Sequence, residues 1–243
     1  MELYIIRHGQ STNNALGEDI TNRVMDAPLT DLGHQQARLV AQHLAGADYA
    51  ETAFSHYPQQ GHREDYGITR MYCSAMHRAL QTAQPIAQAL NLKPEVWVDI
   101  HEHGGIYLEE ANGQYKGYPG LTRTEVSEQF AGYVLPDDLT PQGWWNRDIE
   151  TLHDLHDRAR RVAHKLRHWA EDKHMSQERV ALVSHGMFID SLIKALLDQL
   201  PSGQCYYHHY NTAITRIDLQ ASGDVDVRFI NRTTHLPADM ISA

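Results

Sequence analysis

Short apolar runs alternate with longer amphipathic segments along the chain. The runs predict strands at residues 2–6, 69–73, 95–100, 179–184, 212–219 and 225–230. Apolar residues recur at helical spacing over residues 31–45, 77–91, 148–173 and 187–200. Strands that alternate with amphipathic helices predict an α/β fold, a three-layer sandwich whose mostly parallel sheet carries helices on both faces.

Local signals refine two of the predicted helices. Thr30 is suited to cap the start of helix 31–45, and Gly46 to end it. Pro85 lies within the segment 77–91, where it predicts either a kink or the first turn of a helix.

Two segments interrupt the alternation. Residues 48–67 are polar and rich in Tyr, His and Gln, and residues 103–146 contain Gly, Pro and aromatic side chains. Both predict excursions from the edge of the sheet, and long insertions of this kind serve as lids or specificity loops, or have no role. We expect one domain over residues 1–243 with insertions near 48–67 and 103–146.

Composition narrows the class of partner. Lys and Arg total 21 against 31 for Asp and Glu, and the net charge of -10 disfavours binding to nucleic acid and anionic membranes. The apolar runs are too short to span a bilayer, and two unrelated cysteines form no disulfide framework. We therefore expect a cytoplasmic protein that binds neither nucleic acid nor membrane; its oligomeric state is not indicated.

Two predicted strands end in a histidine followed by a glycine. The first runs into Arg7-His8-Gly9, with Asn14 shortly after it, and the strand at 179–184 runs into His185-Gly186. Ligands of α/β sheets bind beyond the carboxyl ends of the strands. Either motif alone reads as an ordinary turn histidine, but the pair predicts a shared site.

Two further candidates stand near strand ends. Arg78 precedes a predicted helix, where a cation and a helix start both suit a phosphate group. Glu102 follows the strand at 95–100, and a carboxyl group in that place can donate a proton. Taken singly, they read as a surface arginine and a surface glutamate.

In this order the segments resemble the histidine phosphatase superfamily, also called phosphoglycerate mutase-like. The resemblance rests on Arg7-His8-Gly9, Leu29-Thr30-Asp31-Leu32-Gly33, Arg78-Ala79-Leu80-Gln81-Thr82-Ala83, Glu102 and Ser184-His185-Gly186. It implies a phosphoglycerate mutase-like fold and a small phosphorylated substrate.

The resemblance also implies a role for each matching residue. His8 would be the nucleophile that forms a phosphohistidine, and Glu102 the proton donor. The phosphoryl group would be held by Arg7, Arg78, His185 and Asn14. Asn211 would lie near the site.

These residue types suit phosphoryl transfer. Arginine offers planar, permanently charged donors that match phosphoryl oxygens. His8 must be neutral to attack, and neighbouring cations disfavour its protonated form. The scheme needs no metal ion or other cofactor, although His101 and His103 could also be interpreted as a metal-binding pair.

A phosphatase, a mutase and a non-catalytic phosphate-binding module remain as alternatives. By resemblance, a phosphoglycerate mutase carries Glu and Trp where this chain has Gln10 and Asn13, and an arginine pair after the proton donor. Residues 103–122 offer only Lys116 in place of that pair, and Arg160 and Arg161 stand on a predicted helix, where a solvated face explains them. These departures favour a phosphatase. The aromatic residues at 107–118, 144 and 145 could form a substrate cap or simply pack the insertion.

Overall fold

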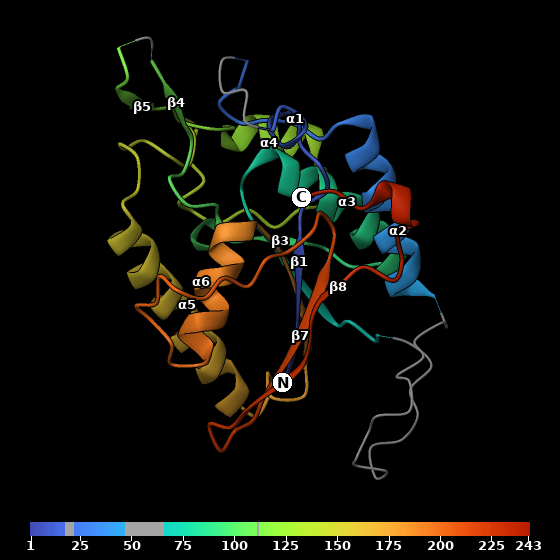
Figure 1. Ribbon diagram of the computed structural model, residues 1–243. Coiled ribbons are helices and arrows are strands. Elements are labelled where there is room, and N and C mark those ends of the chain that lie inside the picture. Colours follow the sequence, from blue (N-terminus) through green and yellow to red (C-terminus); the bar gives the residue numbers. More distant parts are fainter. Residues whose placement is uncertain (18–21, 47–65, 111) are drawn as a thin grey trace.

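A six-stranded sheet forms the centre of the computed structural model, which describes residues 1–17, 22–46, 66–110 and 112–243 (Figure 1). Its strand order is β3-β2-β6-β1-β7-β8. The strands are β1 (Glu2–Arg7), β2 (Arg70–Cys73), β3 (Glu95–Val96), β6 (Arg179–Ser184), β7 (Ile214–Leu219) and β8 (Val225–Arg232). The first four in this order run parallel, whereas β7 and β8 add an antiparallel ribbon beside β1.

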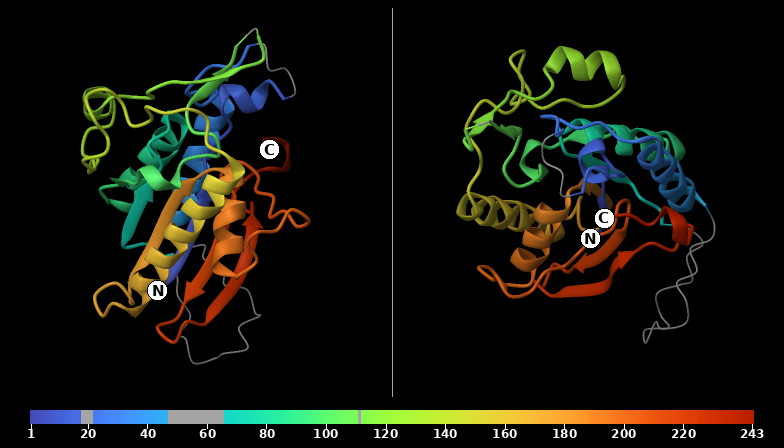
Figure 2. Two further views of the ribbon diagram at one scale, coloured as in Figure 1. Left: turned by 90° about the vertical axis from the view of Figure 1, so that its left-hand side faces the viewer. Right: turned by 45° about the horizontal axis from the view of Figure 1, so that its top comes forward.

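Helices cover both faces of the sheet (Figures 1 and 2). One layer contains α2 (Asp31–Ala45) and α3 (His77–Leu90), and the other contains α5 (Leu152–Glu171) and α6 (Gly186–Leu196). Successive side chains of β1 alternate between the layers: Tyr4 and Ile6 pack towards α2 and α3, and Leu3 and Ile5 towards α5 and α6. The predicted three-layer α/β architecture is confirmed.

The parallel register brings the chemically interesting segments together at one edge. Arg7 lies opposite Ser184, and Cys73 lies opposite Val183. Beyond the strands, the His8 amide donates to the Ser184 carbonyl at 2.9 Å, and the Ser74 amide donates to the Val183 carbonyl at 3.0 Å. The residues that follow β1, β2 and β6 are therefore neighbours.

Some predicted boundaries were wrong. The strand expected at 95–100 is only Glu95–Val96, and a 3-10 turn follows at Val98–Ile100. That apolar run is buried because Val98 and Ile100 pack on opposite sides of the sheet, and burial alone does not separate a strand from a turn. The helix expected at 187–200 ends at Leu196, shortly before Asp198 adopts a left-handed conformation.

Thr30 caps α2 as predicted, because its hydroxyl accepts a hydrogen bond from the Gly33 amide at 3.0 Å. Pro85 lies inside α3 rather than in its first turn. The predicted helix at 148–173 is shorter, because Thr151 caps its start at Leu152.

The insertion at 103–146 has its own secondary structure. It contains an antiparallel hairpin of β4 (Tyr107–Glu109) and β5 (Tyr115–Gly117), followed by α4 (Arg123–Gln129). The hairpin stands at the same end of the molecule as the short α1 (Thr12–Ala15) (Figures 1 and 2). Most of the segment 48–67 lies outside the described residues. No helix within the described part of the chain is long and apolar enough to cross a membrane.

Two glycines allow the loop after β1 to approach α2 closely. A Cβ atom on Gly33 would lie 2.1 Å from the Gln10 carbonyl oxygen, and one on Gly9 would lie 2.6 Å from the Gly33 carbonyl oxygen. Both contacts are with backbone atoms, so no side chain can move aside. The backbone around His8 is thus packed directly on the first turn of α2.

We expect Gly33→Ala to lower the free energy of unfolding by about 1–3 kcal/mol, because the added methyl group overpacks this contact. Replacing Gly by Ala inside a helix ordinarily raises the free energy of unfolding by about 1 kcal/mol. We expect the steric cost at position 33 to outweigh this gain. Urea unfolding measures the change. Gly203→Ala is the matched control, since nothing lies within 4 Å of its Cβ position; equal stability of the two variants would contradict the prediction.

Candidate active site

A cavity of about 460 Å³ opens at the carboxyl edge of the parallel strands. It brings together residues from β1, α1, α3, the loop after the 3-10 turn Val98–Ile100 and the β4–β5 hairpin. Its walls include Arg7, His8, Ser11, Asn13, Asn14, Arg23, Met25, Arg78, Glu102, His103, Gly105, Tyr107, Leu108, Glu109 and Tyr115. Five of the six predicted site residues line it, and the sixth, His185, lies directly behind.

The His8 ring is fixed in one tautomer. Its Nδ1 atom lies 2.6 Å from the Gly9 carbonyl oxygen, which can only accept a hydrogen bond, so Nδ1 carries the proton. The Arg78 Nε–H group donates to His8 Nε2 at 3.1 Å, which marks Nε2 as the atom with the free electron pair. Burial, together with the charges of Arg78 and Arg7, holds the pKa of His8 well below its usual range. His8 is therefore a neutral imidazole.

The two arginines approach His8 from different elements. Arg78 is the second residue of α3, and Arg7 is the last residue of β1. The Nη1 group of Arg7 donates to the His209 carbonyl, while its buried Nε atom has no partner among the described residues. A buried donor without a partner beside a cavity marks a place for an acceptor, as an anion would supply.

Asp26 supplies a counter-charge that acts on the Arg78 guanidinium. Its Oδ1 atom accepts a hydrogen bond from the His77 amide at 3.0 Å, and its buried Oδ2 atom meets no partner in the part of the chain that the structure describes. Burial raises the pKa of Asp26 to about 6, and the charge of Arg78 opposes this rise. Nothing in the sequence singled out Asp26, because it stands in an irregular stretch.

His185 is fully buried, with its ring centre 5.0 Å from that of His8. Ser74 Oγ accepts from the Met76 amide at 3.2 Å and lies 2.8 Å from His185 Nε2. The hydroxyl hydrogen can then donate to Nε2, which leaves the proton of His185 on Nδ1. The Nδ1 atom is buried and no described residue bonds to it, so it is a second donor available to an anion.

Glu102 is held at the start of α6. Its carboxylate accepts hydrogen bonds from the amides of Phe188 at 3.1 Å, Met187 at 3.4 Å and His103 at 2.9 Å. Amides at a helix start suit a carboxylate. The side chain still lines the cavity, on the same wall as His103.

Two asparagines, Asn14 and Asn211, lie near His8. Asn14 accepts hydrogen bonds from the amide and hydroxyl of Ser11 through Oδ1, which turns its Nδ2 group away from that cap. Asn211 donates to the His8 carbonyl at 3.1 Å. The expectation that Asn211 lies near the site is confirmed.

The cavity also contains residues that the sequence did not single out as individuals. Arg23 adds a third arginine, and Tyr107 and Tyr115 meet edge to face with ring centres 5.6 Å apart. The sequence indicated the aromatic residues at 107–118 as a possible substrate cap, which includes the tyrosines. Arg23 belongs to no recognisable motif, so the sequence did not indicate it. Trp144 and Trp145 are buried and lie outside the cavity wall, so they pack the insertion.

The side chains of His101 and His103, interpreted above as a possible metal-binding pair, do not point to one common site. The His101 ring is fully buried and its Nδ1 atom donates to the Val98 carbonyl at 2.7 Å, whereas His103 lines the cavity. Within the described residues no group of three or more His, Cys, Asp or Glu side chains could hold a metal ion.

Comparison with known proteins identifies relatives over nearly the whole chain. The family model of the histidine phosphatase superfamily (branch 1) matches residues 3–58 and 60–232. A probable phosphoglycerate mutase GpmB of Yersinia enterocolitica is 28% identical over 226 residues, which cover 91% of this chain and 86% of the relative.

Solved structures show the same fold at low identity. Phosphoserine phosphatase of Entamoeba histolytica, in complex with 3-phosphoglyceric acid, aligns with a TM-score of 0.60 and 24% identity over 97% of this chain and 99% of its own. Ecdysone phosphate phosphatase of Bombix mori, in complex with tungstate, aligns with a TM-score of 0.60 and 18% identity over 96% of each chain.

The buried histidines predict a loss of stability in acid. Burial depresses the pKa of His8, His101 and His185 strongly, that of His209 to about 4 and that of His235 to about 3. The unfolded chain takes up these protons near pH 6.5, whereas the folded chain does not. The free energy of unfolding should therefore fall as the pH drops from 7 to 5.5, by up to about 1.4 kcal/mol per pH unit for each histidine.

Asp26 and Asp218 work in the opposite direction, since their raised pKa values favour the folded chain in acid, but they are two groups against five histidines. Urea unfolding at several pH values measures the slope. His8→Asn should reduce the slope by one histidine's share, and the exposed His153→Asn is the control. Stability that is independent of pH in this range would contradict the prediction.

Proposed function

The chain belongs to the histidine phosphatase superfamily, and on that premise we propose that it hydrolyses small phosphomonoesters through a phosphohistidine on His8. The observation that carries the proposal is the state of the His8 ring. It is neutral, its Nδ1 proton is held by the Gly9 carbonyl, and its Nε2 atom lies beside a guanidinium group. A phosphoryl group that binds there meets a nucleophile and its counter-charges together.

Buried donors without hydrogen-bond partners among the described residues indicate where the phosphoryl group of the substrate would bind. We place the phosphoryl oxygens among Arg7, Arg78, Asn14 and His185, where Arg7 Nε and His185 Nδ1 have no partner in the described part of the chain. Arg78 would turn its Nε–H group from His8 to the phosphoryl group, which frees Nε2. The Nε2 atom then attacks phosphorus, and the bond from phosphorus to the ester oxygen breaks.

Glu102 acts first as the proton donor and then as the proton acceptor. It donates a proton to the departing ester oxygen and becomes a carboxylate, which the amides of Met187 and Phe188 stabilise. In the second half-reaction this carboxylate takes a proton from water as the water attacks the phosphohistidine. Inorganic phosphate leaves, and His8 and Glu102 return to their initial states.

The alternative of a phosphoglycerate mutase has one specific support, the name of the bacterial relative. Against it, the cavity wall contains no adjacent arginine pair, and Lys116 is not part of that wall. The exposed Arg23 is the cation that could meet a second anionic group. We therefore favour a phosphatase whose substrate is a small metabolite.

We propose a single domain over residues 1–243 that acts in the cytoplasm without a metal ion or other cofactor. The net charge of -10 supports a small phosphorylated partner rather than nucleic acid or an anionic membrane.

The proposal predicts hydrolysis of p-nitrophenyl phosphate that persists in excess chelator. His8→Ala should abolish it, and Glu102→Gln should lower kcat/KM for alkyl phosphates by roughly 10²–10⁴-fold, the range for general acid catalysis.

A phosphodonor should leave an acid-labile label on the wild type and none on His8→Ala. If the wild type shows neither turnover nor label between pH 5 and 8, it is a non-catalytic phosphate-binding module and not an enzyme. Loss of activity in chelator would refute the metal-free scheme.

Incubation with 3-phosphoglycerate separates the two enzymatic alternatives. A phosphatase releases inorganic phosphate, whereas a mutase forms 2-phosphoglycerate without net release. We expect release, and a panel of monoesters with and without a carboxylate should then identify the preferred substrate. Isomerisation faster than release would establish the mutase.

A further inference from the structure

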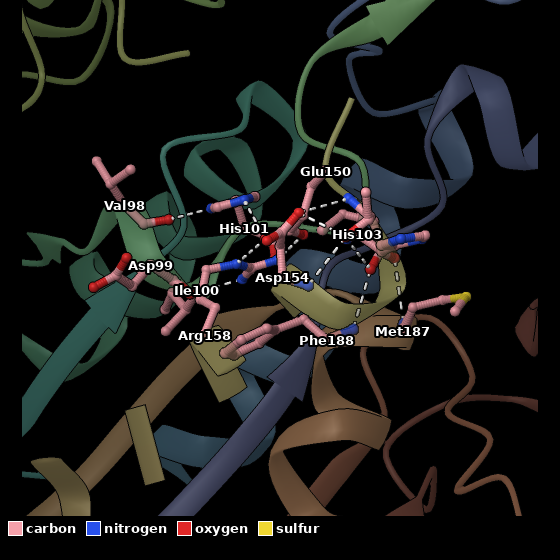
Figure 3. A network of polar contacts seen from close by, with 12 residues as sticks. Val98, Asp99, Ile100, His101, His103, Glu150, Asp154, Arg158, Met187 and Phe188 are labelled. Atoms are coloured by element: carbon pink, nitrogen blue, oxygen red, sulfur yellow. Dashed lines mark hydrogen bonds and ion pairs between the residues drawn. The ribbon is translucent and has the colours of Figure 1, made fainter. Parts of the chain in front are cut away.

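A buried ion pair of Arg158 and Glu150 lies beside the segment from Val98 to His103 (Figure 3). Arg158 on α5 is 1% exposed, and Glu150, just before that helix, is 7% exposed. Their contact is bidentate, from Arg158 Nε to Glu150 Oε1 at 2.7 Å and from Arg158 Nη2 to Glu150 Oε2 at 2.6 Å. Neither residue lines the cavity.

The rest of the Arg158 guanidinium binds the backbone that leads to Glu102. Its Nη1 group donates to the Asp99 carbonyl at 2.8 Å and to the His101 carbonyl at 2.9 Å. Between them, the Ile100 carbonyl accepts from the Ser184 hydroxyl at 2.7 Å. Three consecutive carbonyl groups before Glu102 are thus held by buried donors.

The same pair also reaches the far side of Glu102. The Glu150 amide donates to the Gly104 carbonyl at 3.2 Å, and Glu150 Oε1 lies 3.8 Å from Nε2 of the buried His101 ring. Residues on both sides of Glu102 are therefore tied to one rigid helix start. Figure 3 shows this network beside Met187 and Phe188, whose amides hold the Glu102 carboxylate.

Stability alone is a weak reason for such a pair. Removing two charges from water is costly, and well-packed apolar residues of similar size often replace a buried ion pair without loss. What apolar residues cannot supply is the set of donors that fix the carbonyls of Asp99 and His101.

We propose that Arg158 and Glu150 are positioning residues for Glu102: they fix the loop so that its carboxyl group reaches both the leaving oxygen and the start of α6. This role rests on the proposed function of Glu102 as proton donor. It requires that loss of the pair weaken proton donation specifically, rather than phosphate binding or attack by His8.

Leaving-group dependence separates these effects. p-Nitrophenolate leaves without a proton, whereas the alkoxide of β-glycerol phosphate needs one. In a variant with Arg158→Met and Glu150→Leu, no unpaired buried charge remains. We expect its kcat/KM for β-glycerol phosphate to fall by about 10–100-fold, within the range for general acid catalysis, and that for p-nitrophenyl phosphate to change less than threefold.

Two further variants guard against a general structural effect. Arg161→Met, on the exposed side of the same helix, is the matched control and should preserve the ratio of the two kcat/KM values. Arg158→Lys keeps the charge but cannot make all four hydrogen bonds, so it should shift the ratio in the same direction even if the double variant does not fold. An unchanged ratio in a folded double variant or in Arg158→Lys would overturn the proposal.

A double-mutant cycle with Glu102→Gln tests whether the pair acts through Glu102. In that background, replacing Arg158 and Glu150 should change the β-glycerol phosphate rate by less than threefold. A full, additive loss would overturn the proposal.

Crystal structures distinguish failure of this inference from failure of the proposed function. If the wild type hydrolyses neither ester, the proposed function fails, yet the geometry can still be read. The Glu102 carboxylate should leave the amides of Met187 and Phe188 in Arg158→Lys and remain there in Arg161→Met. An undisturbed carboxylate in Arg158→Lys would overturn the positioning role whatever the activity.

Discussion

The hydrogen bond between His8 Nδ1 and the Gly9 carbonyl determines how the rest of the site can work. It settles which ring nitrogen keeps the proton and directs the other nitrogen towards Arg78. Burial would make a charged imidazole costly, and the two arginines add to that cost. The two arginines that would bind a phosphate group in the proposed function are thus the same groups that keep the His8 ring neutral. The close contact of Gly9 with Gly33 holds this backbone on the first turn of α2, so the arrangement exists before any substrate arrives.

Much of the fold could be predicted because hydrophobic periodicity reports burial on one face or on both. Residues 31–45 and 179–184 gave correct elements, since each is long enough for its period to be unambiguous. The run at 95–100 misled because its side chains are buried around a turn rather than along a strand. The β4–β5 hairpin was missed because its strands have three residues each, too few to show an alternation.

The residues of the candidate site also fall into those that the sequence indicated and those that it did not. His8, His185 and Glu102 were predictable because each stands just beyond a β or 3-10 segment with glycine near it. Ser74, Asp26 and Arg158 were not, because their contacts are with partners far away in the sequence. Arg158 lies 57 residues from the His101 carbonyl that it binds, and Ser74 lies 111 residues from His185. Spacing along a chain carries no information on such pairs; only the register of the sheet and the packing of α5 bring them together.

The cavity is assembled from two structurally separate parts. Its floor comes from strand ends and helix starts anchored in the sheet, whereas its outer wall comes from the β4–β5 hairpin, which pairs with no strand of the main sheet. Exchanging the hairpin alone would therefore change the shape and polarity of this wall while leaving the residues at the strand ends in place. This modularity makes the hairpin the natural target for redesigning selectivity by loop grafting.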